Sequence, residues 1–485
     1  MAETLKEKTV SGIIWTGFQK IGSTLLSFVS TIVLARLLTP EDYGYIGMLA
    51  IFISVSSTFI DGGFGSALIQ KKHPTDEDYS TIFFWNLGLS VFLYFILFSC
   101  APFIARFYRL PLLCVILRIE GIVLIVNAVR IVHLSQLRKQ LRFKVIATVD
   151  LSVSAISLAV TIYLAWKGYG VWALVIQQLM VSTLTTAAYW VTGHWLPILV
   201  FSRESFMRLF GFGGFILLSN LVNSFCNNIQ GLLIGRFYNP ATMGYYSKAR
   251  GTEQIASTFI ASVIDQVSFP VLSEAQNDLE RMQRMLQKFI GVLAFFSFPA
   301  MIFLILLAKP LFLLLYSERW MASVPYFQIL CLAGIAICLQ GINYYAVAAI
   351  GKSNTMFKAT IFKRSVGLLF ILAGLFLWGM RGLLLGVVLD AYVIYIVNAY
   401  LVHRFIGYKL WRQLIDLLPI ILISLLSGLV VYIVGLCLPF HQYLVATIQL
   451  FVFVLFYLFF SFLLRLPAYK DSMDIVRGLL QRVTK

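Results

Sequence analysis

Charged side chains are scarce in this sequence of 485 residues: they make up 12% of it, whereas hydrophobic residues make up 60%. An ordinary soluble protein is about a quarter charged and about 45–50% apolar. The mean hydropathy of +0.87 points the same way. This composition excludes a soluble globular enzyme, a disordered chain and a secreted scaffold held together by disulfides.

Cysteine and histidine are also rare, with six and five residues scattered along the chain. They form no CxxC pair and no Cys/His cluster with metal-ligand spacing, and there is no Walker-type phosphate loop. Most of the cysteines lie in apolar runs, where cysteine acts as a small hydrophobic residue. We therefore expect no metal site, no ATP hydrolysis within this chain and no cofactor, with coupling to Na+ or H+ left open.

Apolar runs account for most of the sequence, and many are long enough to cross a bilayer, which takes about 20 residues. Runs bounded by charges, proline or glycine predict an all-α polytopic membrane protein with about fourteen transmembrane helices. The predicted spans are 10–35, 44–68, 80–105, 112–136, 143–166, 170–192, 207–236, 241–269, 284–307, 323–349, 356–378, 382–403, 414–437 and 442–464. The connections between them are too short for a folded domain outside the membrane.

Basic residues outnumber acidic ones by 38 to 21, a formal net charge of +17. In a soluble protein this excess would suggest a nucleic-acid partner. Here 25 of the basic residues fall on the side of the N-terminus and 8 on the opposite side. Because cytoplasmic segments of membrane proteins are enriched in Lys and Arg, the sequence predicts both termini in the cytoplasm and no nucleic-acid partner.

One segment occurs twice at an offset of 200, since residues 34–45 align with 234–245 through a shared Arg-x3-Pro-x3-Gly-Tyr pattern. Proline and glycine in this pattern favour a tight connection between the first two spans of each half. The repeat predicts two parallel six-span halves, as in transporters that rock one half against the other. The predicted organisation is an N-terminal six-helix bundle at 1–192, a cytoplasmic linker at 193–206, a second six-helix bundle at 207–405, two additional helices at 406–464 and a basic cytoplasmic tail at 465–485.

Three motifs resemble those of a known transporter family. They are the Arg-x3-Pro-x3-Gly-Tyr junction, the start of span eight at Tyr246-Ser247-Lys248-Ala249-Arg250 and its end at Phe269-Pro270-Val271-Leu272-Ser273. From about residue 11 to 464 the chain is similar to polysaccharide-export flippases of the multidrug/oligosaccharidyl-lipid/polysaccharide (MOP) exporter superfamily, and within them to colanic-acid-type exporters.

This resemblance implies a transporter and no enzymatic activity. Its substrate would be an oligosaccharide linked to a polyprenyl pyrophosphate, carried across the bacterial inner membrane by alternating access for cell-surface polysaccharide biosynthesis. The implied partners are this lipid-linked substrate and membrane lipids, and contacts with other polysaccharide-assembly proteins are left open.

Ionisable residues within a bilayer cost about 2.5–3.5 kcal/mol each and usually face a bundle interior or a watery cavity. Lys20 lies about 15 Å deep in the first span, at 1.5 Å of rise per residue, where its charge suits an anionic headgroup. We predict that the residues binding substrate in a central cavity are Lys20, Arg118, Arg130, Asn223, Asn227, Lys248 and Arg250. A paired structural lysine is the alternative for Lys20, and Arg130 is equally compatible with a topological anchor.

Four carboxylates in predicted spans are candidates for ion coupling or for pairing with these cations. They are Asp61, Glu120, Glu253 and Asp265. Glu253 stands three residues after Arg250, a spacing that permits an ion pair on one helix face. Asp61 is followed by Gly62, Gly63 and Gly65, and we predict a hinge at these glycines because glycine loosens a helix.

A cation-coupled drug or small-molecule antiporter of the same superfamily is the alternative function. Such antiporters share the two six-span halves, but have twelve spans where this sequence predicts fourteen. A cationic drug favours carboxylates in the cleft, whereas a pyrophosphate favours the lysine and arginine found in the first and eighth spans. The sequence leaves the glycan, the driving force and the oligomeric state undetermined.

Overall fold

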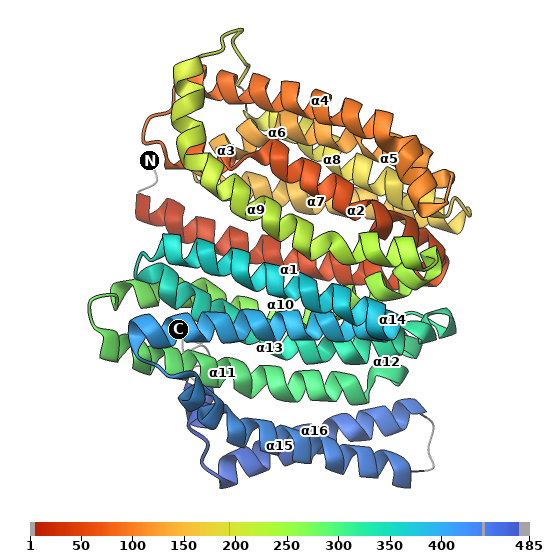
Figure 1. Cartoon of the computed structure of the whole chain (residues 1–485), viewed down its shortest axis with the longest axis vertical. Coiled ribbons are helices and arrows are strands. Elements are labelled where there is room, and N and C mark those ends of the chain that lie inside the picture. Colours follow the sequence, from red (N-terminus) through yellow and green to blue (C-terminus); the bar gives the residue numbers. More distant parts are fainter. Residues whose placement is uncertain (1–4, 194, 439–441, 475–485) are drawn as a thin grey trace. The chain divides into compact units, whose positions relative to one another are not determined.

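A computed structural model describes residues 5–193, 195–438 and 442–474, in which every regular element is a helix (Figure 1). This confirms the all-α fold. The helices up to residue 237 are α1 (Leu5–Leu37), α2 (Pro40–Asp61), α3 (Phe64–Gln70), α4 (Asp76–Tyr108), α5 (Leu112–Glu120), α6 (Ile122–Lys139), α7 (Phe143–Trp166), α8 (Val171–Gly193) and α9 (Arg203–Phe237). The later ones are α10 (Pro240–Glu274), α11 (Leu279–Leu306), α12 (Ala308–Leu315), the 3-10 helix η1 (Glu318–Ser323), α13 (Val324–Ala349), α14 (Ser353–Ile406), α15 (Leu410–Cys437) and α16 (Gln442–Leu463).

Eleven helical stretches of the described residues are long and apolar enough to cross a membrane, so the chain is a multi-pass membrane protein. Helices α9 and α10 match predicted spans but are not among these eleven, which were identified over the described residues alone. Two further predicted spans fall within one stretch, Thr355–Ile406. The exact number of spans therefore stays a prediction.

Helix α14 is a helical hairpin and not a straight rod, because Trp378 and Gly379 leave the helical conformation and Gly379 has φ 61°. A β-carbon at Gly374 would lie 2.1 Å from the carbonyl oxygen of Gly382, and one at Gly382 would lie 1.9 Å from that of Gly374. The two arms therefore touch through their backbones on either side of the turn. This turn separates the predicted spans 356–378 and 382–403.

The chain divides by its internal contacts into two compact units, residues 1–247 and 248–485. In the first unit α1 packs on α7, α7 and α6 pack on α8, and α9 packs on α2. In the second unit α13 packs on α14 and α11, and α11 packs on α15, which pairs with α16. The first unit extends past the predicted linker at 193–206, because α9 packs against α2, α3 and α4.

Both copies of the repeated motif form tight turns between long helices. At the first copy, Thr39 caps α2: its hydroxyl accepts a hydrogen bond from the Asp42 N–H, and the Asp42 carboxylate accepts one from the Thr39 N–H at 2.9 Å. At the second copy, the Asn239 side chain accepts a hydrogen bond from the N–H of Thr242 at 2.8 Å. Such caps satisfy backbone donors that a helix start would otherwise leave unpaired.

The two turns also press against each other within the first unit. A β-carbon at Gly44 would lie 1.9 Å from the carbonyl oxygen of Pro240, and one at Gly244 would lie 1.8 Å from the carbonyl oxygen of Pro40. Each glycine thus sits against the proline of the other copy. We call this pair of contacts the reciprocal crossing; it requires glycine at both positions because there is no room for a side chain.

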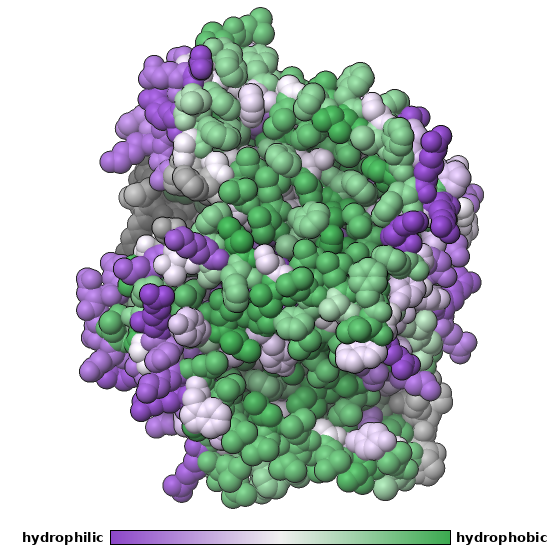
Figure 2. All heavy atoms as spheres, in the orientation of Figure 1, coloured by the Kyte–Doolittle hydropathy of each residue, from purple (hydrophilic) through white to green (hydrophobic). Residues whose placement is uncertain are grey.

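On the face shown in Figure 2, apolar side chains predominate along the helices and hydrophilic residues gather toward the helix ends. Helix α4 exposes Phe92, Phe95 and Phe103 at 61%, 66% and 68%, and α15 exposes a similar row of leucines. A water-facing surface of this kind would be an aggregation hazard. Lipid is the environment that these faces fit.

Candidate functional site

A polar cavity of about 330 Å³ lies inside the first unit, between helices α1, α6, α7 and α8. Its wall combines charged and neutral polar side chains with three apolar ones. They are Thr16, Gln19, Arg130, Leu134, Arg138, Phe143, Ile146, Asp150 and Tyr189. We refer to it as the arginine cavity.

Helical spacing brings its charged residues to one place. Arg130, Leu134 and Arg138 are four residues apart along α6, so they share one face of that helix. On α7, Asp150 stands four residues after Ile146, and both face the cavity. Two guanidinium groups and one carboxylate therefore line the wall, which leaves it one formal positive charge.

The Asp150 carboxylate is held by neutral hydrogen-bond donors. The amide of Gln19 on α1 donates to its Oδ2 at 2.6 Å, and the hydroxyl of Tyr189 on α8 donates to its Oδ1 at 2.7 Å. Hydrogen bonds to a charged acceptor are among the stronger ones in proteins. Asp150 thus ties three helices together, and both of its oxygens are occupied without an arginine.

Neither arginine of the cavity forms an ion pair within 4.0 Å among the residues that the structure describes. Both are close enough to Asp150 to interact with it electrostatically, and Arg138 also acts on Asp61. Arg130 is half-buried and Arg138 is exposed. Both arginines line the cavity, and the one carboxylate on its wall already accepts hydrogen bonds from Gln19 and Tyr189.

The other basic residues at the α6–α7 turn have structural partners. The ammonium of Lys139 donates to the backbone carbonyls of Leu68, Ile69 and Lys71, which end helix α3. Arg142 donates to the carbonyl of Thr192 at 3.0 Å, and Lys144 lies over the ring of Trp15 at 5.5 Å. These contacts fasten the turn to its neighbours and leave Arg138 facing the cavity.

Of the predicted substrate-binding residues, Arg130 lines the arginine cavity. Lys20 follows Gln19 on α1 and is exposed, and no ion pair joins it to Asp61 in the described residues. Arg118 packs over the ring of Phe98 at 4.2 Å and donates to its carbonyl at 3.4 Å, so its guanidinium has a structural partner. Substrate binding by these residues stays a prediction.

The polar stripe of α9 divides between packing and exposure. The side chain of Asn228 donates to the hydroxyl of Ser54 at 3.2 Å, and Ser54 also bonds Ser224 at 2.7 Å, so these residues join α9 to α2. Asn227 is exposed and Asn223 is half-buried. The structure thus uses part of the stripe for interhelical hydrogen bonds.

The carboxylate candidates of the first unit lie in different surroundings. Glu120 is buried at 2% exposure with Gln178 as hydrogen-bond partner, whereas Asp61 is exposed at the end of α2. Gly62 and Gly63 follow with φ of 54° and 71°, and α3 starts at Phe64. Gly65 is already helical, so the break lies at the first two glycines; motion there stays a prediction.

In the second unit, Lys248 is enclosed by aromatic rings. Its ammonium lies 4.7 Å from the ring centre of Tyr316 and 5.0 Å from that of Trp320, and the residue is 4% exposed. Cation–π contacts stabilise a desolvated ammonium by about 2 kcal/mol. Burial raises the pKa of the Tyr316 phenol, which is also bonded to Thr252 at 2.9 Å.

The remaining predicted residues lie on the same helix, α10. Arg250 is half-buried, and Glu253 is buried beside Gly334 with Ser257 as hydrogen-bond partner. The side chain of Asp265 lies outside the described residues.

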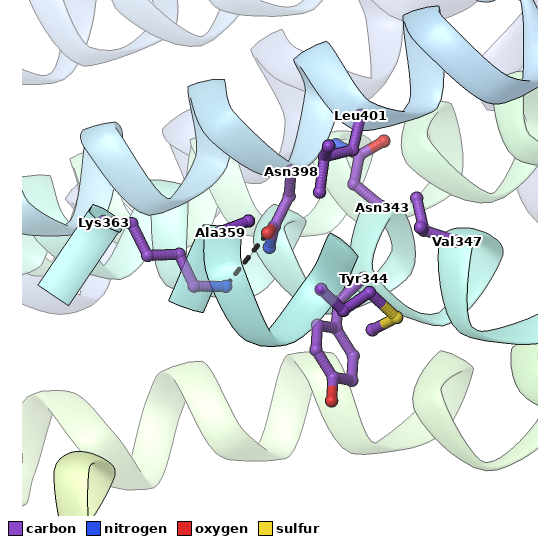
Figure 3. Close-up of a pocket in the computed structure, with 8 residues that line it drawn as sticks. Asn343, Tyr344, Val347, Ala359, Lys363, Asn398 and Leu401 are labelled. Atoms are coloured by element: carbon purple, nitrogen blue, oxygen red, sulfur yellow. Dashed lines mark hydrogen bonds between the residues drawn. The ribbon is translucent and has the colours of Figure 1, made fainter. Parts of the chain in front are cut away.

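Sequence reasoning missed a buried lysine in the second unit. Lys363 is one of the 25 basic residues that the sequence places on the side of the N-terminus. In the structure it lies between the two arms of α14 at 6% exposure and donates to Asn398 at 3.1 Å (Figure 3). The ring of Tyr344 on α13 faces its ammonium at 5.6 Å. Next to it, Arg364 pairs with Asp390 at 3.7 Å. These contacts fasten the hairpin arms to each other and to α13.

Four polar residues of the arginine cavity were also missed: Thr16, Gln19, Arg138 and Tyr189. Gln19 and Tyr189 carry no charge, and Arg138 was assigned to the cytoplasmic loops. Besides the predicted Arg130, the signal in the sequence that points to this place is Asp150, an ionisable residue within the predicted span 143–166. The described residues contain no group of three or more His, Cys, Asp or Glu side chains that could hold a metal ion.

Comparison with known sequences gives one family. Residues 33–325, more than half of the chain, match the sequence model of a family described as "Polysaccharide biosynthesis protein". The chain is 26% identical to the teichuronic acid biosynthesis protein TuaB of Bacillus subtilis over 73% of this chain and 74% of that one. It is 23% identical to the lipopolysaccharide biosynthesis protein WzxC of Escherichia coli over 88% and 89%. The succinoglycan biosynthesis transport protein ExoT of Rhizobium meliloti is 25% identical over 69% and 68%.

Comparison with solved structures shows which fold this is. The lipid II flippase MurJ, in an inward closed conformation, superimposes with a TM-score of 0.79 at 16% identity, covering 95% of this chain and all of that one. A multidrug resistance MATE family transporter of the MOP superfamily, in its inward-facing conformation, gives a TM-score of 0.62 at 16% identity over 82% and 98%. At these identities the likeness concerns the fold alone, which the chain shares with a lipid II flippase and with a transporter of the MOP superfamily.

Proposed function

Because the chain belongs to the family of polysaccharide biosynthesis proteins, we propose that it is a flippase for a lipid-linked oligosaccharide. It would move an oligosaccharide carried on a polyprenyl pyrophosphate across the bacterial inner membrane, for the assembly of a cell-surface polysaccharide. The observation that carries this proposal is the family match together with a fold shared over 95% of the chain with a lipid II flippase. The relatives named for teichuronic acid, lipopolysaccharide and succinoglycan biosynthesis support it.

The mechanism we propose is alternating access. The repeated motif gives the chain two related halves, and rocking of one against the other is how such repeats transport. The sugar and its diphosphate would enter a polar path, while the polyprenyl tail would stay in lipid beside the apolar helix faces. Transport of this kind makes and breaks no covalent bond, so the chain would act without catalysis.

Orientation and energy coupling belong to the same proposal. Both termini would lie in the cytoplasm, as the distribution of 25 and 8 basic residues favours. Coupling to Na+ or H+ would involve a carboxylate within the membrane, with Asp61, Glu120, Glu253 and Asp265 as candidates. Uptake by proteoliposomes under imposed Na+ and proton gradients would identify the coupling ion. Contacts with other polysaccharide-assembly proteins would be found by cross-linking in the native membrane.

A cation-coupled drug antiporter is the second candidate, supported by the likeness to multidrug transporters at a TM-score of 0.62. The flippase is supported better, because the likeness to MurJ covers more of the chain at a higher TM-score. The cationic side chains that line the arginine cavity also suit an anionic ligand and not a cationic drug.

The decisive experiment is deletion of the gene followed by analysis of the lipid-linked oligosaccharides on each leaflet. The flippase proposal expects an oligosaccharide to accumulate on the cytoplasmic leaflet and the surface polysaccharide to disappear, both reversed by the gene in trans. Unchanged surface polysaccharide together with a new sensitivity to cationic drugs would refute it and favour the antiporter.

A further inference from the structure

We propose that the arginine cavity binds a diphosphate anion, held between Arg130 and Arg138. This inference deepens the proposed function and rests on it for the source of the ligand, because a polyprenyl pyrophosphate carries such a group. The chemistry of the cavity itself indicates the class of ligand.

The charge of the cavity is the first argument. Two guanidinium groups face it, and the one carboxylate on its wall is already hydrogen-bonded by Gln19 and Tyr189 at 2.6 and 2.7 Å. Each guanidinium presents five N–H donors in a planar fork that fits phosphate oxygens two at a time. In the described residues these forks have no carboxylate within 4.0 Å. An anion is therefore the ligand that completes the site.

The spacing of the two arginines indicates a diphosphate. They are eight residues apart on α6, which places their Cα atoms about 12 Å apart along the helix axis. Leu134 lies between them and supplies no hydrogen bond. A diphosphate is longer than a single phosphate and offers more terminal oxygens, so it engages two separated guanidinium groups with less convergence of their side chains. The volume of about 330 Å³ accommodates the larger anion.

A bound cation at Asp150 is the competing interpretation, and the contacts argue against it. Asp150 is the one carboxylate on the wall, and each of its oxygens already accepts a hydrogen bond, so the cavity offers a cation a single acidic ligand. Arg130 and Arg138 both act on Asp150 electrostatically and would repel an incoming cation. We instead assign Asp150 the role of moderating the affinity, because its negative charge weakens the hold on the anion and so permits release.

The test uses the purified full-length chain in nanodiscs of phosphatidylcholine. Its binding of inorganic pyrophosphate is measured by isothermal titration calorimetry. We expect Arg130→Gln and Arg138→Gln each to weaken binding about tenfold, since a charged hydrogen bond is lost in each. Asp150→Asn should tighten binding, because it removes the repulsive charge. Lys144→Gln is the matched control on the same turn, where the ammonium lies over Trp15, and should leave binding unchanged.

The direction of the Asp150→Asn effect on pyrophosphate affinity distinguishes two cases. At an anion site the substitution raises the affinity, whereas in a purely structural network it would only weaken the packing. Arg130→Lys and Arg138→Lys keep the charge and check that any loss is not a folding defect; they should retain more binding than the glutamine variants. Equal binding by wild type and both glutamine variants, or weaker binding after Asp150→Asn, would overturn the proposal.

Two further arms identify the source of the anion and keep the two proposals separable. Undecaprenyl pyrophosphate in the disc should compete with inorganic pyrophosphate if the ligand is a lipid headgroup, and should leave its binding unchanged if the ligand is a free diphosphate.

Polysaccharide export by the Arg138→Gln variant is then measured in the deletion strain. Export that needs the gene but proceeds normally with a variant unable to bind pyrophosphate defeats the site and leaves the flippase intact. Pyrophosphate binding in a chain whose deletion leaves export normal defeats the flippase and leaves the site intact.

Discussion

Replacing either glycine of the reciprocal crossing with alanine should destabilise the first unit. The added β-carbon at Gly44 would lie 1.9 Å from the carbonyl oxygen of Pro240, whereas an ordinary C···O approach is about 3.3–3.6 Å. The α2 and α10 backbones would therefore have to separate by about 1.4 Å or more. No rotamer change relieves this clash, because the obstructing atom belongs to the backbone.

Forced separation of a packed contact costs about 1–3 kcal/mol. In a unit of this size that corresponds to a fall of about 2–4 °C in the unfolding midpoint for each kcal/mol. We expect Gly44→Ala and Gly244→Ala to lower the midpoint by similar amounts. The double variant should cost less than the sum of the two, since a single separation of the backbones accommodates both new methyl groups.

The assay is fluorescence-detected size-exclusion chromatography after heating for a fixed time in detergent. Gly88→Ala on α4 is the control, because apart from its own helix turn no described residue lies within 4 Å of its β-carbon position. This control should be neutral or slightly stabilising, since alanine favours a helix over glycine by up to about 1 kcal/mol. If Gly44→Ala retained the wild-type midpoint, the close backbone contact in the crossing would be refuted.

Three further predictions use the same heating assay or an export assay. Asp78→Asn should cost about 3 kcal/mol of stability and so lower the unfolding midpoint. The substitution removes the fully buried carboxylate that pairs with the partly buried ammonium of Lys71. An unchanged midpoint would contradict this ion pair. Tyr316→Leu removes one of the two aromatic rings that enclose the Lys248 ammonium. It should lower stability more than Tyr316→Phe, which keeps the ring and loses one hydrogen bond worth about 1 kcal/mol. Equal losses of stability would argue against the cation–π contact. Lys20→Ala and Arg250→Ala should reach the membrane in normal amounts yet fail to restore polysaccharide export to the deletion strain; normal export would remove both from substrate binding.

The helices were accessible from sequence because apolar length and helix-ending residues are local properties. The turn of α14 illustrates this, since Trp378 and Gly379 leave the helical conformation between two spans that the sequence had already separated. The offset of 200 between the two motif copies was also readable, although their direct contact was not.

The arginine cavity could not be predicted from the sequence, because packing and not residue type determines which side chains line it. Arg138 and Lys139 are adjacent in sequence, and both are basic. Lys139 nevertheless donates hydrogen bonds to the carbonyls at the end of α3, whereas Arg138 lines the cavity. Likewise, the environment of Lys248 depends on Tyr316 and Trp320, which are about 70 residues further along the chain. Sequence spacing within one helix carries no information about either contact.

The reciprocal crossing has the form of an isologous interface, the type found across the two-fold axis of a symmetric dimer. Gly44 meets Pro240 as Gly244 meets Pro40, although all four residues belong to one chain. In such an interface one surface patch is its own partner, so a change in one copy alters the fit of the other. The proline and glycine that both copies share are therefore the residues on which their mutual fit depends.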